Sequence, residues 1–451
     1  MKLHFIAIGG SAMHNLALAL HEKGYLISGS DDEIFEPSRS RLKKKGLLPE
    51  EEGWFPGKIT KELDAVILGM HAKKDNPELL RAKELGLRVF SYPEFLYEQS
   101  KNKKRIVIAG SHGKTTITAM VMHVLHEGGV DFDFMVGAQL DGFDVMVRIS
   151  ETAELMVLEG DEYLTSPDDP RPKFHLYRPH VALITGIAWD HINVFPTYQV
   201  YVDQFRQFIK LIEPGGLLTY FEGDTDLRSI AGINPGIRTA PYDLPELVRR
   251  GDITYLLDTG KEYPLQVFGK HNMQNIAGAM KVCSELGISG EAFAKAISTF
   301  AGASRRLQLI AASGSSSVFL DFAHAPSKLR ATVEAMKEQY PERKLVACME
   351  LHTYSSLSKA FLDQYKGGMD MADVALVYFN PHALKIKRLP AITTKMVKQA
   401  FGREDLHVYD DSAQMLEKLY AMDWKNRNLL LMSSGNFDGW DIQSIAHQIT
   451  S

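Results

Sequence analysis

The chain has 451 residues, of which 45% are hydrophobic and 24% charged, and its formal net charge is -5 at pH 7. A chain of this length is too long to fold around a single hydrophobic core, so we expect about three domains. The sequence has no apolar stretch of about 20 residues, so we predict no membrane span. The negative net charge argues against nucleic acid as the main partner. The only two cysteines, Cys283 and Cys348, lie in apolar surroundings. A disulfide framework is therefore not expected, and the cytoplasm is the natural compartment.

The first hundred residues alternate short apolar runs with helix-like segments. Strands are predicted at residues 3–8, 25–31, 64–70 and 87–92. A helix is predicted near residues 12–23, after a turn at Gly9 and Gly10. This alternation predicts a parallel, doubly wound sheet. The glycine turn and the later Ser30 and Asp31 match part of a dinucleotide-binding fingerprint. The turn is compatible with a bound diphosphate. Because the glycine pattern is incomplete, it does not predict a nicotinamide cofactor.

Residues 105–125 (RIVIAGSHGKTTITAMVMHVL) place a glycine-containing loop between a β-branched, strand-like run and a helix. The loop consists of Gly110, Ser111, His112, Gly113, Lys114, Thr115 and Thr116. Backbone N–H groups at such a helix N-terminus can face an anion, and a lysine adds positive charge. We therefore predict a phosphate loop, shorter than the common form because only two residues separate its glycines. A chance glycine turn is the alternative.

After the first hundred residues, a second and a third block of the chain continue the alternation of strands and helices. In the second block, residues 153–163 and 180–191 are predicted apolar strands that lead to Glu159 and His191. The carboxyl ends of strands are where open α/β sheets hold their ligands. The third block predicts strands at residues 317–324, 344–351, 373–379 and 428–435, and hence another α/β domain.

Three residues of the second block suggest metal-assisted phosphoryl chemistry. Thr115 offers a hydroxyl and Glu159 a carboxylate, and both are hard oxygen ligands. Mg²⁺ prefers few protein ligands together with phosphate oxygens and water, so these two groups are enough to share one ion with a nucleotide. His191 is the third candidate ligand, although a lone histidine is more often structural.

Six motifs lie in order over all three blocks: GSHGKTT, EGDEY, WDHINVF, GKHNMQNIAGA, SRRLQ and LDFAHAP. Together they resemble the Mur ligase family, the ATP-dependent amide-forming enzymes of bacterial peptidoglycan synthesis. The resemblance implies a fold of three α/β domains. Residues 1–100 would form a Rossmann-like UDP-sugar-binding domain, and residues 101–302 a P-loop ATPase-like domain with a mostly parallel sheet. Residues 303–451 would form a Rossmann-like domain that binds the incoming amine.

The resemblance also implies roles for individual residues, with ATP and Mg²⁺ as cofactors. The catalytic residues would be Lys114, Glu159, His191 and Arg306, and the metal ligands Thr115, Glu159 and His191. ATP would be bound by the loop residues 110–116 together with Asn272, Asn275, Arg306 and Asp321. The substrates would be bound by Gly9, Gly10, Met13, Ser30, Asp31, His324 and His352. Without the resemblance, Asn272 is equally a helix cap, Arg306 a surface ion pair, and Asp321 and His324 a polar cluster at a strand end.

The branch of the family that acts on UDP-N-acetylmuramate fits best, and two amine donors compete within it. Residues 160–179 and the sequence MSSGNFDGWD resemble the members that add the tripeptide L-Ala-γ-D-Glu-meso-diaminopimelate in peptidoglycan recycling. DNPEL resembles the members that add L-alanine. We expect the tripeptide, with L-alanine as the alternative.

The sequence departs from the branch at two places. Ala325 stands where the family usually has a second histidine, and His352 or Thr353 stands where the tripeptide-adding members have an arginine. Carboxylates of the donor would then depend on other groups. The candidates are His352, Ser355, Ser356, Lys359 and Arg388. These departures leave open a nucleotide-binding module that has lost catalysis. A nicotinamide oxidoreductase rests only on the first glycine turn and Asp31.

Overall fold

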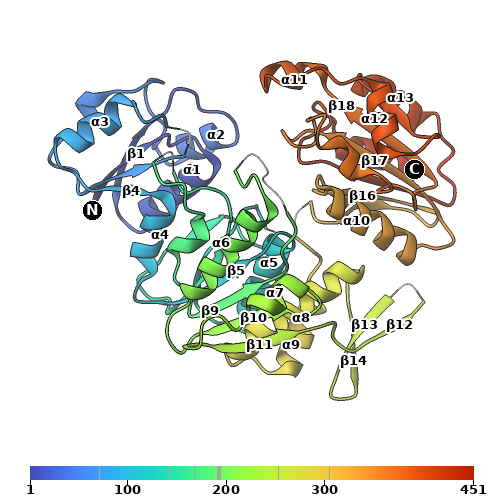
Figure 1. The fold of residues 1–451 in the computed structure, drawn as a ribbon, viewed down its shortest axis with the longest axis horizontal. Coiled ribbons are helices and arrows are strands. Elements are labelled where there is room, and N and C mark those ends of the chain that lie inside the picture. Colours follow the sequence, from blue (N-terminus) through green and yellow to red (C-terminus); the bar gives the residue numbers. More distant parts are fainter. Residues whose placement is uncertain (71, 141, 167, 190–193, 252, 304) are drawn as a thin grey trace. The chain divides into compact units, whose positions relative to one another are not determined.

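The computed structural model describes residues 1–70, 72–140, 142–166, 168–189, 194–251, 253–303 and 305–451. These residues form four sheets, and the chain separates into two compact units (Figure 1). The first unit comprises Met1–Trp189, Val194–Asp243 and Ala277–Phe293, and the second comprises Leu244–Ile276 and Ala294–Ser451. Among the described residues, no helix is long and apolar enough to cross a membrane.

The first unit begins with a parallel four-stranded sheet in the order β2-β1-β3-β4. Its strands are β1 (Lys2–Ile6), β2 (Leu26–Ser30), β3 (Ala65–Leu68) and β4 (Val89–Ser91). Its helices are α1 (Ser11–Glu22), α2 (Ser38–Lys44), η1 (Pro56–Lys58), α3 (Pro77–Glu84) and α4 (Tyr92–Ser100). Local capping sets two of these helix starts: the Asn76 side chain accepts backbone N–H bonds at the start of α3, and Ser91 and Glu94 form a capping box at α4. All four predicted strands are confirmed.

A seven-stranded sheet in the order β11-β10-β9-β5-β8-β6-β7 follows, parallel except for β7. The strands are β5 (Lys104–Ala109), β6 (Phe132–Met135), β7 (Val147–Arg148), β8 (Leu155–Glu159), β9 (Val181–Ile184), β10 (Leu217–Phe221) and β11 (Arg238–Tyr242). The helical segments are α5 (Lys114–Glu127), η2 (Lys173–Leu176), α6 (Tyr198–Lys210) and α7 (Thr225–Ile230). The apolar run Ile106, Val107 and Ile108 is fully buried, which explains why β5 lies in the middle of the sheet. The loop after β5 therefore emerges at the centre of the sheet's carboxyl edge.

The second unit contains a six-stranded sheet in the order β15-β16-β20-β17-β18-β19, parallel except for β15. The strands are β15 (Gln308–Ala312), β16 (Ser316–Asp321), β17 (Lys344–Leu351), β18 (Val374–Phe379), β19 (His407–Tyr409) and β20 (Arg427–Met432). The helices are α10 (Pro326–Gln339), η3 (Leu362–Tyr365), α11 (Pro381–Ile386), α12 (Thr394–Phe401), α13 (Ser412–Tyr420) and α14 (Ile442–Thr450). Residues of α10 and α12 join one apolar cluster and those of α13 and α14 another, so helices cover both faces of this sheet (Figure 1).

The small antiparallel sheet of the second unit was not predicted from the sequence. It consists of β12 (Leu247–Arg250), β13 (Ile253–Asp258) and β14 (Lys261–Pro264). The helices α8 (Lys270–Glu285) and α9 (Gly290–Ile297) contribute to both units. The small sheet is largely exposed and polar, so its strands lack the apolar runs that mark the buried strands. The division into domains 1–100, 101–302 and 303–451 stays a prediction, since the first two sheets share one compact unit.

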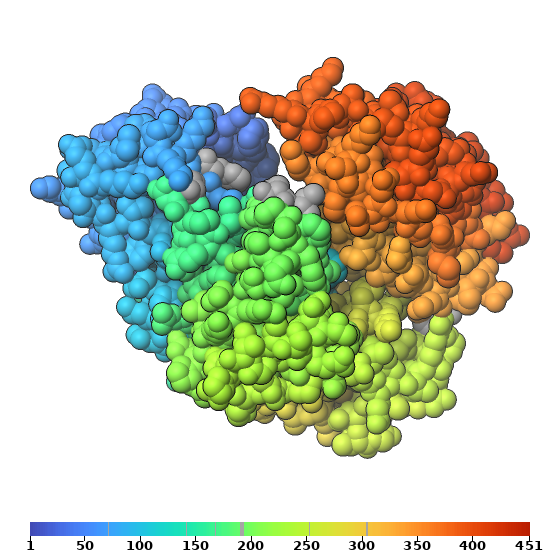
Figure 2. Space-filling view, in the orientation of Figure 1, coloured from blue at the N-terminus to red at the C-terminus, as the bar shows by residue number. Residues whose placement is uncertain are grey.

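A buried arginine ties the two sheets of the first unit together. Arg105, in β5, is 2% exposed, and its guanidinium lies 3.2 Å from the Glu213 carboxylate. The guanidinium donates to the backbone carbonyls of Ser100, Lys101, Lys103, Tyr177 and Arg178. A buried guanidinium is tolerated when its donors are satisfied in this way. Arg105 thus fastens the end of α4 to β5, and Figure 2 shows the blue surface of residues 1–100 adjoining the cyan-to-green surface of the residues that follow.

We expect Arg105→Met to destabilise the protein by at least about 3 kcal/mol, because it leaves Glu213 and several buried carbonyls without a donor. Thermal unfolding followed by circular dichroism should show Tm lowered by several degrees. Arg81→Met is the matched control: it removes an exposed ion pair with Glu84 and should leave Tm almost unchanged. Equal Tm values for the two variants would contradict this role of Arg105.

Candidate active site

The loop between β5 and α5 has a backbone that only glycine adopts without strain. Gly110 and Gly113 have φ angles of 121° and 80°. A Cβ atom on Gly110 would lie 2.0 Å from the Thr185 hydroxyl oxygen in the neighbouring segment after β9. Helix α5 begins at Lys114, directly after Gly113. The loop therefore brings its backbone and the helix N-terminus together, as an anion site requires.

Thr115 and Glu159 meet at the carboxyl edge of the sheet. The parallel pairing of β5 and β8 sets Glu159 opposite Ile108. The Thr115 hydroxyl donates to one oxygen of the Glu159 carboxylate at 2.8 Å, and the backbone N–H of Gly137 donates to the other at 2.7 Å. Glu159 is buried, so these bonds fix a single position for its carboxylate. The two candidate metal ligands are thus adjacent before any nucleotide binds.

This pair of oxygen ligands suits Mg²⁺ shared with a nucleotide. Within the described ranges, no group of three or more His, Cys, Asp or Glu residues is placed to hold a metal by itself. A hydroxyl and a carboxylate are compatible with an ion whose other ligands are phosphate oxygens and water. His191, the third predicted ligand, lies outside the described residues.

The loop lysine is already paired. The Lys114 ammonium donates to the Gly110 carbonyl at 2.7 Å and to the Glu162 carboxylate at 2.6 Å, and Glu162 is 1% exposed. Burial lowers the pKa of Lys114, but Glu162, Asp161 and Glu159 raise it more, so its pKa stands above the ordinary value. These two bonds leave one ammonium N–H for a phosphate oxygen. Sequence reasoning missed Glu162, and its only signal was the acidic run EGDEY.

Ser111 and His112 connect the loop to its surroundings. The Ser111 hydroxyl shares a hydrogen bond of 2.8 Å with the Tyr201 hydroxyl and accepts one of 2.8 Å from the Ala188 N–H. The His112 carbonyl accepts a hydrogen bond from the Thr185 hydroxyl. Thr116 is buried in α5. These contacts hold the loop in shape, and the predicted contribution of the three residues to ATP binding stays a prediction.

The predicted UDP-sugar residues gather at the ends of β1 and β2. The Gly9 N–H donates to the Asp31 carboxylate at 2.7 Å, and a Cβ atom on Gly9 would lie 2.9 Å from the same carboxylate. Burial raises the pKa of Asp31 to about 6, against the lowering effect of the Gly9 N–H. Gly10 directly precedes α1, and Met13 is buried in the first turn of that helix. Ser30, the residue before Asp31, is also buried. The geometry is a tight glycine turn facing the N-terminus of a 12-residue helix.

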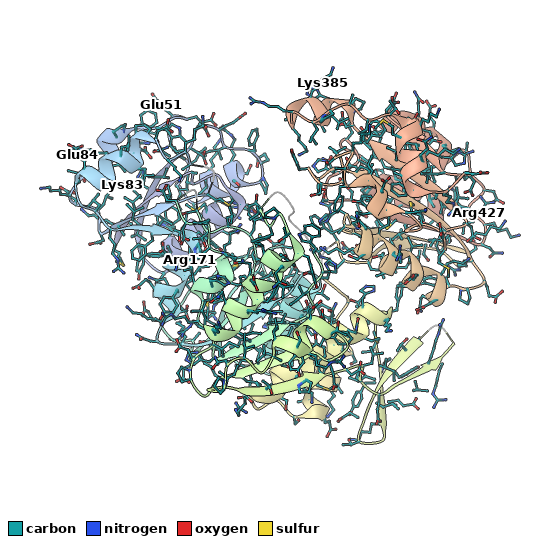
Figure 3. The ribbon with its side chains drawn as sticks, in the orientation of Figure 1. Glu51, Lys83, Glu84, Arg171, Lys385 and Arg427 are labelled. Atoms are coloured by element: carbon teal, nitrogen blue, oxygen red, sulfur yellow. The ribbon has the colours of Figure 1, made fainter. Side chains whose placement is uncertain are left out.

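Residues 160–179 form one ion pair within the segment and another with the N-terminal sheet domain. Lys173 contacts Asp161 at 2.6 Å, and Asp168 contacts Lys83 of α3 at 3.1 Å; Lys83 is labelled in Figure 3. Burial raises the pKa of Asp161, but Lys173 and Lys114 lower it more, and the pKa falls to about 2. The segment is therefore anchored at one end beside the loop and at the other on the N-terminal sheet domain.

The predicted adenine-binding asparagines lie in the first turns of α8. Asn272 and Asn275 are both buried, and the Asn272 side chain donates to the Phe268 carbonyl at 2.9 Å. Helix α8 starts at Lys270, so the alternative that Asn272 caps the helix is wrong. The amide oxygen of Asn272 accepts no hydrogen bond from the described residues.

Arg306 and Asp321 lie at the carboxyl edge of β16 in the second unit. Asp321 accepts backbone N–H bonds of 2.6 Å from both Leu307 and Ala323, and burial raises its pKa. The Arg306 guanidinium lies 4.6 Å from the centre of the Phe322 ring. Asp321 thus organises the turn that carries Arg306, which forms no ion pair with the described residues. His324 is three residues further on, with its Nδ1 2.9 Å from the Phe322 carbonyl.

His352 stands beside a carboxylate that sequence reasoning missed. Its Nδ1 lies 3.6 Å from Oε1 of Glu350, which is 3% exposed at the end of β17. Glu350 accepts hydrogen bonds from the Ser433 hydroxyl and from the Phe437 N–H, the latter at 2.9 Å. The loop after β20 therefore holds this carboxylate in place. Glu350 lies inside an apolar strand, so the sequence pattern alone predicts a core residue at this position.

Comparison with known proteins identifies the family. Residues 2–104, 108–283 and 305–435 match, in order, the models of the Mur ligase family catalytic domain, the Mur ligase middle domain and the Mur ligase glutamate ligase domain. The UDP-N-acetylmuramate–L-alanine ligase of Agathobacter rectalis is 30% identical over 453 residues, which cover 97% of this chain and 96% of that protein. The chain belongs to the Mur ligase family. Members of this family are ATP-dependent, amide-forming ligases, and so is this Mur ligase.

Solved structures confirm the expected α/β fold of this Mur ligase. The murein peptide ligase of Psychrobacter arcticus matches with a TM-score of 0.67 at 24% identity, covering 100% of this chain and 99% of that one. The UDP-N-acetylmuramate–alanine ligase of Thermotoga maritima matches with a TM-score of 0.72 at 20% identity, covering 100% and 98%. At these identities the likeness shows the fold alone.

We expect Gly110→Ala to weaken ATP binding by at least about tenfold, or about 1.4 kcal/mol, because its Cβ atom would displace Thr185 and distort the loop. The measurement is the Kd for ATP by titration calorimetry. Gly129→Ala is the matched control, since Gly129 also has a positive φ, of 66°, but faces open space. A Gly110→Ala variant that binds ATP as tightly as the control would contradict the assignment of the loop.

Proposed function

We propose that this Mur ligase joins the carboxylate of UDP-N-acetylmuramate to the amino group of the tripeptide L-Ala-γ-D-Glu-meso-diaminopimelate, at the expense of ATP, in peptidoglycan recycling. The observation that carries the ATP-dependent part is the convergence of Lys114, Thr115 and Glu159 at one end of β5. A lysine on a glycine loop, a hydroxyl and a carboxylate are the groups that phosphoryl transfer needs.

The chemistry explains why these groups suffice for the first step. A carboxylate does not react with an amine directly, because oxide is a poor leaving group. Transfer of the γ-phosphoryl group of ATP to the carboxylate gives an acyl phosphate, from which phosphate leaves readily. The carboxylate is already ionised at neutral pH, so this step needs no base. It needs positioning and neutralisation of charge.

Each residue of the loop region then has a defined task. Lys114 and the backbone N–H groups of the loop would hold the phosphates, with Glu162 keeping the ammonium in place. Thr115 and Glu159, with His191, would hold Mg²⁺, which offsets negative charge among the phosphates and the carboxylate when it is bound. The roles of Arg306, Asp321, Asn272 and Asn275 toward the nucleotide rest on the family resemblance and on their place in the second unit.

The glycine turn of the N-terminal sheet supports binding of the UDP-sugar. A diphosphate at Gly9 and Gly10 would meet the positive end of α1. Asp31 already binds the Gly9 N–H, so it would shape the turn as well as face the nucleoside. The buried Met13 and Ser30 would line the same turn.

The tripeptide is favoured by the 160–179 segment, which is longer than a short connection and forms ion pairs both beside the loop and with α3. L-alanine is the second candidate, and the curated relative from Agathobacter rectalis, named as an L-alanine ligase, favours it. Of the donor contacts expected near β17, Ser356 is wrong: it is fully buried and bonded to Thr353. Lys359 and Arg388 are exposed and remain available to a donor carboxylate.

Competition between the two donors tests this choice. With ATP, Mg²⁺ and UDP-N-acetylmuramate, we expect kcat/KM for the tripeptide to exceed that for L-alanine. A preference for L-alanine of more than about tenfold, or roughly 1.4 kcal/mol of transition-state binding, would assign the protein to biosynthesis instead. If no donor leads to release of phosphate from ATP, the protein would instead be a nucleotide-binding module that has lost catalysis.

Lys114→Ala tests the proposed ATP site. We expect kcat to fall by about a thousandfold or more, because a charged contact to the transferring phosphoryl group is lost. Binding of the UDP-sugar, measured by calorimetry, should be nearly unchanged because it belongs to the N-terminal sheet. A variant with kcat within about tenfold of wild type would exclude the loop as the ATP site.

A further inference from the structure

The carboxyl edge of β17 in the second unit carries a buried carboxylate next to an accessible imidazole. The Glu350 carboxylate is 3% exposed, whereas the His352 side chain is 42% exposed. Their nearest atoms, Oε1 and Nδ1, are 3.6 Å apart. No other carboxylate among the described residues contacts His352.

The surrounding loop fixes the carboxylate rather than the imidazole. Oε2 of Glu350 accepts hydrogen bonds from the Ser433 hydroxyl and the Phe437 N–H, which leaves Oε1 for His352. A Cβ atom on Gly435 would lie 2.7 Å from His352 Nδ1 and 2.8 Å from Glu350 Oε2. The loop backbone therefore presses directly against the pair, and only glycine permits this approach.

The Glu350 carboxylate carries a negative charge beside the imidazole. Burial raises the pKa of Glu350, but the nearby His352, the Ser433 hydroxyl and the Phe437 N–H lower it more, so the carboxylate is ionised at neutral pH. The charged neighbour on the other side of the loop is Arg305, whose guanidinium donates to the Ser433 and Gly435 carbonyls. The second ring nitrogen of His352, Nε2, has no hydrogen-bond partner in the described parts of the chain.

An ionised carboxylate 3.6 Å from Nδ1 and an open Nε2 form an arrangement in which histidine acts as a general base. We propose that His352 is the catalytic base that takes a proton from the ammonium group of the incoming amine, and that Glu350 is its positioning residue. This inference rests on the proposed function, because it requires an amine donor and an acyl phosphate.

The reaction needs such a base only in its second step. The α-amino group of a peptide has a pKa near 8, so about nine tenths of it is protonated at pH 7 and cannot attack. His352 Nε2 would accept one ammonium proton, which frees the nitrogen lone pair. The C–N bond then forms as the bond from carbon to the phosphate oxygen breaks. The second N–H proton leaves with phosphate as HPO₄²⁻, and His352 returns its own proton to water.

Hydroxylamine separates the base from every earlier step, because it is largely uncharged at neutral pH and attacks an acyl phosphate without first losing a proton. The N–H proton lost after the attack leaves with phosphate. For His352→Gln, we expect kcat for amide formation with the preferred donor to fall about a hundredfold at pH 7. Formation of the hydroxamate from ATP, UDP-N-acetylmuramate and hydroxylamine should stay within about twofold of wild type. His407→Gln, on β19 of the same sheet, is the control and should change neither rate.

Two further measurements separate the base from a structural role. The deficit of His352→Gln should shrink by at least about fivefold between pH 7 and pH 9, because the donor amine then deprotonates in water. Glu350→Gln keeps oxygen and shape but loses the charge, and should lower amide formation about tenfold while sparing the hydroxamate.

Each outcome decides between the alternatives. Equal loss of amide and hydroxamate formation in His352→Gln, or amide formation within about threefold of wild type, would overturn the role of His352. A deficit that stays constant from pH 7 to pH 9 would do the same. If the wild-type protein itself forms no hydroxamate on UDP-N-acetylmuramate, the proposed function fails, independently of the base.

Discussion

The parallel pairing of β5 with β8 is the constraint on which the loop site depends. It sets Glu159 opposite Ile108, and the next residue, Gly160, donates its N–H to the Ile108 carbonyl at 2.7 Å. A Cβ atom on Gly160 would lie 2.9 Å from a Val107 methyl carbon, so the strands close tightly at this edge. A shift of one residue would turn Glu159 to the other face of the sheet and away from Thr115. The distance between hydroxyl and carboxylate is thus a consequence of strand register.

The same edge resolves the electrostatic problem of a largely buried loop lysine, whose side chain is 14% exposed. Three carboxylates, at positions 159, 161 and 162, lie at the end of β8 within four residues. Each has a different partner: Thr115 for Glu159, Lys173 for Asp161 and Lys114 for Glu162. Their charges raise the pKa of Lys114 and so keep it protonated. The 160–179 segment supplies Lys173, so the segment that distinguishes the proposed donor class also balances charge beside the phosphate loop.

Much of this arrangement is predictable from sequence, and the reason is local. The buried strands β5, β8, β16, β17 and β20 carry apolar runs, and the loop motif lies between a strand and a helix as its chemistry requires. What could not be predicted depends on contacts between distant residues. Glu162 and Tyr201 are 39 residues apart, and Glu350 and Ser433 are 83 apart. The register and the loop backbone that join them have no signature in a single sequence.

The second unit shows the same limit at His352. The family resemblance made His352 a candidate, at the place where an arginine was expected. Its carboxylate partner lies within β17 and looks like one more core residue until the loop after β20 is in place. The sequence shows only that the site lacks the expected arginine. The structure shows that the site instead holds an imidazole beside the fixed negative charge of Glu350.

Formation of an acyl phosphate on the muramyl carboxylate is the central chemical claim, and oxygen transfer tests it most directly. UDP-N-acetylmuramate labelled with ¹⁸O in its carboxylate is converted with ATP, Mg²⁺ and the preferred donor, and the released phosphate is analysed by mass spectrometry. An acyl phosphate predicts one ¹⁸O atom in each phosphate released, because the carboxylate oxygen that accepted the phosphoryl group departs with it. Phosphate without label, alongside normal amide product, would contradict the mechanism.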